Sequence, residues 1–293
     1  MKTKHAIYCL FFLLLIQSCS KKSAADFNSN FSTFKPYITN FSGGLVSAQS
    51  DLRVVLAFAN DEWKKDQVLD NNLFSISPSV DGKVVALSSS TIAFIPTKKL
   101  KSDTEYQVTL HLSKLIKTPK ELNDFNFTVK TIKQDFIVDT DDVQSYSPVY
   151  QYLNANLKTA DKMDFETASK LITAEQNGKK LKLKFEKSSS SSTEFKFIID
   201  SLQRYDSDTT LKISYDGNSF DINQKGTIEY SVKGKNNFTV VEASVLHNTE
   251  GTLLLNFSDP LSKDQDFDGL ISIDGARNLK YAVQGNLLKV FFN

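Results

Sequence analysis

Three alternating aspartates come nearest to a metal site in this chain. Asp264, Asp266 and Asp268 are followed by Gly269, as at the start of a calcium-binding EF-hand loop, and carboxylate oxygens are ligands that Ca²⁺ accepts. The EF-hand pattern also needs a glutamate at loop position twelve, where this chain has Gly275. We therefore expect no cofactor and interpret the segment as a solvated loop, with calcium binding as the minor alternative.

Residue types that commonly serve as nucleophiles, bases and zinc ligands are scarce. The 293 residues include three histidines and two cysteines. His111 is expected in a strand and His247 in a turn, and both are interpreted as surface residues. Asp139, Asp141 and Asp142 are interpreted as part of a solvated linker. No G-x-S-x-G motif, zinc-ligand spacing or glycine-rich phosphate loop is present. The sequence therefore predicts a protein that is not an enzyme.

Cys19 is the residue for which we predict covalent chemistry. Two lysines in the first four residues precede an apolar run, Ala6 to Ile16, which has the length of a signal peptide and is too short to span a bilayer. The run leads into Ile16-Gln17-Ser18-Cys19, which resembles the bacterial lipobox. We predict that residues 1–18 are a signal peptide, cleaved between Ser18 and Cys19, and that Cys19 then carries lipid.

The predicted lipid sets the expected compartment. Residue 20 is serine rather than the aspartate that typically retains lipoproteins in the inner membrane, so we expect an outer-membrane lipoprotein that faces the periplasm. Residues 19–33 are predicted to be a lipidated, flexible tether. The formal net charge is +1, which gives no basic field for nucleic acid.

Beyond the tether, short apolar runs bounded by turn residues predict an all-β chain. Asp81-Gly82 is typical of a hairpin between flanking strands, and Leu181 to Phe185 alternates strictly, as one strand with lysines facing water would. Asp164 precedes apolar residues at helical spacing and predicts one short helix. We expect tandem Ig-like antiparallel β-sandwiches over 34–133 and 134–235, followed by a partial third sandwich over 236–293.

An internal repeat supports the third sandwich. The segment from Leu52 to Ile95 resembles the segment from Leu253 to Phe291, and Leu73-Phe74-Ser75-Ile76 aligns with Leu270-Ile271-Ser272-Ile273. The first copy is followed by further strands, whereas the second copy reaches the last residue within an apolar strand. We therefore predict that the last sandwich is incomplete and that these residues are the N-terminal piece of a longer protein.

The framework residues resemble the N-terminal region of bacterial alpha-2-macroglobulins, which are lipoproteins that trap proteases. The resemblance is carried by Leu52-Arg53-Val54-Val55-Leu56-Ala57-Phe58, Phe94-Ile95-Pro96, Leu100, Thr104-Glu105-Tyr106, Gly178-Lys179-Lys180-Leu181, Leu211-Lys212-Ile213-Ser214-Tyr215-Asp216-Gly217, Asn256-Phe257-Ser258-Asp259-Pro260-Leu261 and Gly269-Leu270-Ile271. It implies macroglobulin-like sandwiches that serve as scaffold. The family's protease-sensitive bait segment and Cys-x-x-Gln thioester have no counterpart in these residues.

Two functions follow as expectations. The first is the N-terminal scaffold portion of a lipid-anchored, alpha-2-macroglobulin-like protease inhibitor, with the membrane, the rest of a longer macroglobulin chain and proteases as partners. The alternative is a surface or periplasmic Ig-like lipoprotein that binds a protein or a glycan. A glycan binder would more often expose several tryptophans, and this chain has Trp63 alone, which favours the first expectation.

Overall fold

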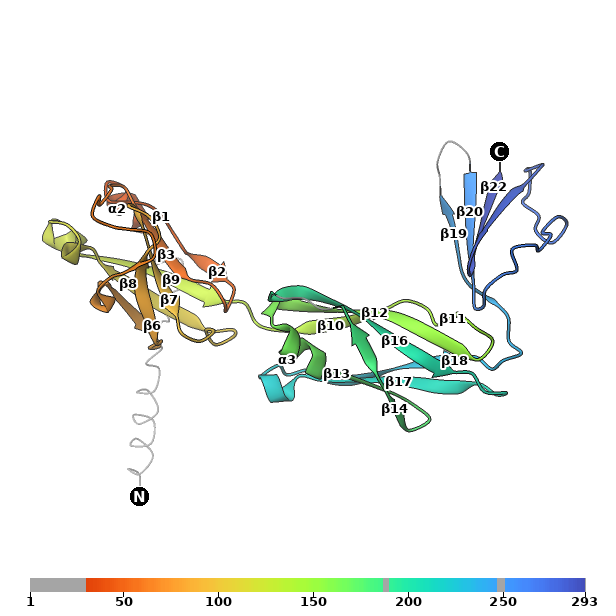
Figure 1. Ribbon diagram of the computed structural model, residues 1–293. Helices are drawn as coiled ribbons and strands as arrows, with labels where there is room; N and C mark the ends of the chain where they lie inside the picture. The colour runs from red at the N-terminus through yellow and green to blue at the C-terminus, as the bar shows by residue number, and fades with distance from the viewer. Residues whose placement is uncertain (1–29, 187–189, 247–250, 293) are drawn as a thin grey trace, which may run out of the picture. The chain divides into compact units, whose positions relative to one another are not determined.

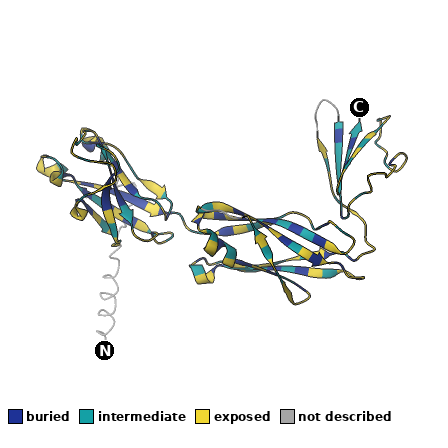
Figure 2. Cartoon of the chain, in the orientation of Figure 1, coloured by how far each residue is buried: buried dark blue, intermediate teal, exposed yellow. Residues whose placement is uncertain are grey.

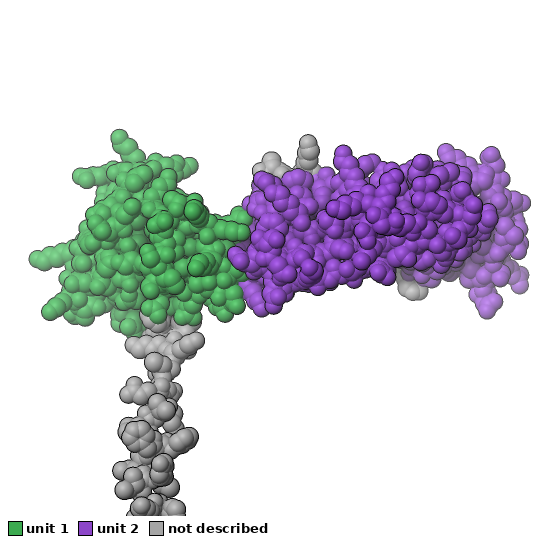
Figure 3. Space-filling model, turned by 90° about the horizontal axis from the view of Figure 1, so that it is seen from below, with its two compact units in different colours: residues 1–132 green, residues 133–293 purple. Residues whose placement is uncertain are grey.

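The computed structural model describes residues 30–186, 190–246 and 251–292 (Figure 1). The predicted signal peptide, the predicted lipid attachment site Cys19 and His247 lie outside the described residues. Figure 3 colours two compact units, one up to residue 132 and one from residue 133. Within the described part of the chain, no helix is long and apolar enough to cross a membrane. The chain is nearly all β, as predicted.

The first unit is a sandwich of a five-stranded and a four-stranded sheet. The strands are β1 (Ile38–Phe41), β2 (Gly44–Val46), β3 (Leu52–Leu56), β4 (Gln67–Val68), β5 (Phe74–Ser77), β6 (Gly82–Ala86), β7 (Thr91–Pro96), β8 (Glu105–His111) and β9 (Asp124–Thr131). Short helical segments are α2 (Phe31–Phe34), η1 (Asn71–Leu73), η2 (Leu112–Lys114) and η3 (Lys120–Leu122). The sheet orders are β1-β3-β7-β6-β4 and β2-β9-β8-β5.

These orders are those of an immunoglobulin fold. In chain order, with the two-residue β4 set aside, β1-β3-β7-β6 occupy strand positions A, B, E and D, and β9-β8-β5 occupy G, F and C. The β2 strand pairs with β9 in parallel, whereas the sequence predicted antiparallel pairing in every sheet. The cause is that β1 and β2 are two successive parts of the first strand position, and β2 has crossed to the other sheet beside the last strand.

The prediction of a hairpin at Asp81-Gly82 is wrong. β5 pairs with β8, whereas β6 pairs with β7, so the turn carries the chain from one sheet to the other. Gly82 is needed there for a close approach, because a Cβ at this position would lie 2.7 Å from the carbonyl oxygen of Ile95.

Alternating apolar residues form the core of the first sandwich. Phe125 lies at its centre, with ring centroids 5.0 Å from Phe34, 5.1 Å from Phe41 and 5.6 Å from Phe127. Tyr106, at the start of β8, is 2 % exposed. Its hydroxyl accepts a hydrogen bond from a backbone N–H five residues upstream (2.9 Å), as in the tyrosine corner of Ig domains.

The second sandwich also has two sheets, β10-β12-β16-β15 with β11 on β12, and β14-β13-β17-β18. Its strands are β10 (Phe136–Thr140), β11 (Gln144–Ser145), β12 (Tyr150–Met163), β13 (Ile172–Gln176), β14 (Lys179–Leu181), β15 (Leu183–Phe185), β16 (Ser192–Gln203), β17 (Thr209–Asp216) and β18 (Lys225–Val232), with helical segments α3 (Phe165–Lys170) and η4 (Asn218–Phe220). These strands occupy positions A-B-E-D and C′-C-F-G.

Two local expectations for the second sandwich have different outcomes. The helix is confirmed as α3, because the Asp164 carboxylate accepts the Thr167 backbone N–H at 2.8 Å as an N-cap. The prediction of one alternating strand from Leu181 to Phe185 is wrong. The chain leaves one sheet at the end of β14 and enters the other at β15, a crossing that simple alternation does not reveal.

The C-terminal part of the second unit is one four-stranded sheet, β19 (Val240–Leu246), β20 (Gly251–Phe257), β21 (Lys280–Gln284) and β22 (Leu287–Phe292). Its order, β19-β20-β22-β21, is the same as that of β1-β3-β7-β6. The chain is therefore a tandem of Ig-like modules in which the third presents the A-B-E-D sheet.

Burial differs between the repeated segments (Figure 2). The inner residues of β3, Val54 and Leu56, are 0 % and 2 % exposed, whereas their aligned counterparts on β20, Leu253 and Leu255, are only partly buried. Leu73 is 5 % exposed before β5, but Leu270 in the matching segment is 68 % exposed. Residues 271–274 form no strand, because the described residues include no counterpart of β8 for them to pair with.

Candidate functional site

The acidic segment that suggested calcium lies between β20 and β21. The Asp268 backbone N–H donates to the Asp266 carboxylate (3.0 Å), and Phe267 between them is buried with its ring 5.6 Å from Tyr281. Burial first, and then the charges of Asp268 and Asp266, raises the pKa of the Tyr281 phenol. Asp264 is exposed. Among the described residues, no three His, Cys, Asp or Glu side chains are grouped to hold a metal.

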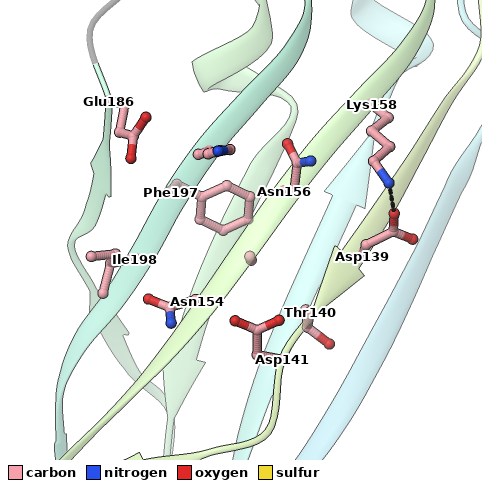
Figure 4. A pocket seen from close by; sticks show the side chains of 11 residues that line it. Asp139, Thr140, Asp141, Asn154, Asn156, Lys158, Glu186, Phe197 and Ile198 are labelled. Atoms are coloured by element: carbon pink, nitrogen blue, oxygen red, sulfur yellow. Dashed lines mark ion pairs between the residues drawn. The ribbon is translucent and has the colours of Figure 1, made fainter. Parts of the chain in front are cut away.

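The outer face of the second sandwich carries a pocket of about 450 Å³ (Figure 4). Residues of β10, β12 and β16 line it, and Glu186, the residue after β15 (Leu183–Phe185), lies at its edge. Its lining includes Asp139, Thr140, Asp141, Asn154, Asn156, Lys158, Glu186, Lys196 and Ile198. The linker interpretation of Asp139 is wrong, because this residue lies in β10.

Polar contacts organise this pocket. Asp139 and Lys158 form an ion pair at 2.7 Å, which raises the pKa of the lysine through a hydrogen bond and the carboxylate charge. Asn156 donates to Glu194 at 2.5 Å, while its Oδ1 is buried with no hydrogen-bond partner. A buried carbonyl oxygen without a partner is rare in folded proteins, and a hydrogen-bond donor that entered beside it would satisfy it. Hydroxyl and amide groups have that chemistry.

Tyrosines extend the same face along β12. Tyr146 and Tyr150 are stacked with centroids 6.4 Å apart, and Tyr152 lies 6.0 Å from Tyr146. Tyr146 is 49 % exposed and Tyr150 is 42 % exposed. We call Tyr146, Tyr150 and Tyr152 together with the pocket lining the tyrosine–amide face. An aromatic platform beside carboxamides suits a sugar ring or a peptide.

An ion pair at the edge of this face keeps one carboxyl group ionised. Lys184 contacts Asp200, and this hydrogen bond, first among several causes, lowers the pKa of the Asp200 carboxyl. Burial raises the pKa of the neighbouring Tyr146 phenol. The face therefore keeps a carboxylate and a neutral phenol at neutral pH.

A second polar constellation lies in the first sandwich. The Ser75 hydroxyl is 2.7 Å from His111 Nε2, and His111 Nδ1 is 2.6 Å from an Asp124 carboxylate oxygen. The sequence places His111 in a strand, as observed, but gives no signal of this relay, because its residues are brought together only by the pairing of β5, β8 and β9. Trp63 packs against the apolar core of this sandwich.

A buried arginine links the second sandwich to the C-terminal sheet. The Arg204 side chain is 1 % exposed and forms an ion pair with Asp259. The guanidinium also donates to four other oxygens, those of the Lys233, Gly234 and Asn237 carbonyls and of the Ser145 hydroxyl. We call these residues the Arg204 joint. Asp259 belongs to the Ser258-Asp259-Pro260 block quoted above, and the joint gives that block a structural role.

Comparisons with known proteins find solved structures of low similarity to this chain. No family model matches the chain, and no curated protein matches it. A titin I9–I11 tandem is 8 % identical with a TM-score of 0.29 and covers 87 % of this chain and 88 % of its own. The ectodomain of mouse nectin-like molecule 4 is 10 % identical with a TM-score of 0.27, covering 84 % and 85 %. Scores this low carry no argument, so the Ig-like assignment rests on the strand orders described above.

Proposed function

We propose that this chain is the scaffold portion of a lipid-anchored protease inhibitor of the alpha-2-macroglobulin type. In this proposal Cys19 holds the chain at the outer membrane, the Ig-like modules act as rigid spacers, and the C-terminal sheet docks against a further macroglobulin-like sheet. The inhibitor class comes from the resemblance of the framework residues. The docking comes from the geometry of the C-terminal sheet.

The incomplete cover of one face of the C-terminal sheet supports the proposed docking. Leu253 pairs with Val290, which is 0 % exposed, so both lie on the core face of the sheet. Val245 pairs with Leu253 on that face, yet it is 47 % exposed. The segment around Phe267 covers the β21–β22 side of the face. The β19–β20 side is left without a cover among the described residues.

The first sandwich indicates what would cover this side. There the equivalent strands β1 and β3 face β9, and Phe41 packs against Phe125 and Phe127. We infer that the occupant is a strand pair with alternating large apolar residues, equivalent to β8 and β9. Burying a fully exposed valine contributes about 1.5–3 kcal/mol, and because Val245 is 47 % exposed, covering it contributes roughly half of that.

Cysteine accessibility in cells tests this docking. Val245→Cys should react slowly with a maleimide in the native protein, because the occupant covers it. Val68→Cys is the matched control, since Val68 is a strand valine with 61 % exposure in a fully formed sandwich. Equal labelling of both would refute the docking.

The native product also has a mass that can be measured. An antibody against residues 34–130 should detect a band several times larger than 32.9 kDa if the occupant belongs to the same polypeptide. A single stable band near 32.9 kDa together with a protected Val245→Cys would assign the occupant to another protein. That mass together with a reactive cysteine would argue against the inhibitor scaffold.

The tyrosine–amide face supports a second candidate, an Ig-like lipoprotein that binds a glycan or a protein. The carrying observation is the exposed tyrosine stack on the same outward face as Asn156, whose Oδ1 has no hydrogen-bond partner. Binding of the full chain to an array of glycans and peptides should be lost in Tyr150→Ala and kept in Phe238→Ala, because Phe238 is an aromatic with 57 % exposure outside this face. Equal binding by both variants would exclude the face as the site.

A further inference from the structure

Ser75, His111 and Asp124 form a hydrogen-bonded relay at one end of the sheet β2-β9-β8-β5. His111 is the last residue of β8, and Asp124, its cross-strand partner, is the first residue of β9. Ser75 lies on β5, the neighbour of β8 on its other side. The relay therefore spans three adjacent strands, which hold its members more firmly than a loop would.

The hydrogen-bonding capacity of Asp124 selects one tautomer of a neutral His111 imidazole. An ionised carboxylate can only accept a hydrogen bond, so Asp124 takes the Nδ1–H of neutral His111 at 2.6 Å. Nε2 then carries no proton and accepts from the Ser75 hydroxyl at 2.7 Å. This is the order of nucleophile, base and orienting carboxylate that activates a serine for acyl transfer.

Two neighbouring hydrogen bonds lie beside the relay without joining it. Lys114, just after β8, donates from its ammonium to the carbonyl of Asn72, just before β5, at 2.8 Å. This contact ties together the two segments that flank the relay. Thr109 on β8 donates to Asn126 on β9 at 2.6 Å, so the adjacent polar pair is satisfied by itself.

We propose that Ser75 is an activated nucleophile that accepts acyl groups from small activated esters. A bond forms between Ser75 Oγ and the ester carbonyl carbon as the Oγ proton passes to His111 Nε2. The bond from that carbon to the leaving oxygen then breaks, and the leaving group takes the proton from Nε2. Water releases the acyl group by the same proton path, with Nε2 as base.

The exposure of the relay defines its substrates. The side chains of His111 and Asp124 are 26 % and 51 % exposed, and Ser75 is exposed. An open sheet face gives access to small esters and offers little shape selection. Base assistance alone is worth about 10²–10⁴-fold in rate, and we expect Ser75 to react within that range above an unassisted strand serine.

The full chain provides its own matched serine for the test. Ser77 lies two residues along β5, on the same outward side, and is also exposed, but it pairs with Gln107 instead of standing beside a histidine. After incubation with p-nitrophenyl acetate or a fluorophosphonate probe, fragmentation mass spectrometry of the β5 peptide should place the adduct on Ser75 at least about 100-fold faster than on Ser77.

Variants separate activation from simple exposure. His111→Gln should lower Ser75 labelling to the rate of Ser77, and Asp124→Asn should lower it at least tenfold because the imidazole is no longer held in the reactive tautomer. Thr109→Ala, on the same face, should leave the rate unchanged and controls for altered packing. Equal labelling of Ser75 and Ser77, or a rate that His111→Gln does not change, would overturn the proposal.

Discussion

Replacing Arg204 by methionine would test whether a buried cation holds the C-terminal sheet to the second sandwich. Methionine keeps much of the length of the arginine stem while it removes the charge and the hydrogen-bond donors. The Arg204 joint contains one charge pair, with Asp259, and hydrogen bonds to four further oxygens. The perturbation therefore removes most of the polar contacts that meet at this point.

The magnitude follows from burial. Breaking a buried ion pair by removal of one partner costs about 3–5 kcal/mol, because the other charge stays buried without compensation. The Asp259 side chain is 18 % exposed and regains some water, which places the expected loss at the lower limit, about 3 kcal/mol. A loss of this size raises the local opening constant roughly 100-fold.

Hydrogen exchange is the appropriate assay, because a chain with several modules does not unfold in one step. The amide of Ser258, bonded to Thr239, and the amide of Ser145, bonded to Ser258, should lose about two orders of magnitude of protection in Arg204→Met. Amides of β17 serve as an internal reference. The matched control is Lys184→Met, which breaks the exposed pair with Asp200 and should leave both amides unchanged.

The opposite outcome would be informative. If Ser258 and Ser145 kept their protection within about threefold in Arg204→Met, the guanidinium would not be the element that holds the joint. Asp259→Asn gives a second, independent perturbation. The double variant should cost clearly less than the sum of the two single variants, since both act on one ion pair.

Three further predictions concern the sandwiches themselves. Tyr106→Phe should destabilise the first sandwich by about 1 kcal/mol through loss of the hydrogen bond from Lys101, measured as a lower urea midpoint, and an unchanged midpoint would contradict the tyrosine corner. Leu73→Ala should lower the free energy of unfolding by about 2–5 kcal/mol, because Leu73 is buried. Leu270→Ala, at the aligned exposed position, should change it by no more than about 0.5 kcal/mol. Equal losses would contradict the different packing of the repeats. The second sandwich should lose stability as the pH falls below about 4, because carboxyls with a lowered folded-state pKa stabilise the fold above their unfolded pKa and release that stability as they protonate. The carboxyls concerned are those of Asp200, Asp208 and Asp216. Replacing these three residues by asparagine should flatten the pH profile of stability, and an unchanged profile would contradict the assignment.

Hydrogen bonds to lysines and to the backbone are the cause of those lowered pKa values. The backbone N–H of Gly234 is the largest influence on Asp208, and the Lys225 ammonium is the largest on Asp216. Since each carboxylate is stabilised by a native contact, the sign of the pH dependence is fixed. Stability is fully present above the unfolded pKa and decreases as the pH falls through the folded pKa.

Features that depend on neighbouring residues could be predicted from the sequence. Alternation of apolar residues indicates strands because successive side chains point to opposite faces, and the all-β architecture follows from that. Asp164 indicates the start of α3, since a cap needs only its own next few residues. The repeat indicates that β19-β20-β22-β21 resembles the sheet of the first sandwich. Lipidation of Cys19 stays a prediction.

Tertiary structure decided everything that depends on strand pairing over long separations. Only pairing shows that Asp81-Gly82 and Leu181 to Phe185 cross between sheets. It also brings Ser75 to His111 across 36 residues. Arg204 reaches Asp259 across 55 residues through a side-chain contact between segments that follow two strands not paired with each other. The physical reason is that a sheet register is set by the packing of the whole core, so no local pattern reports which distant side chains will share a face.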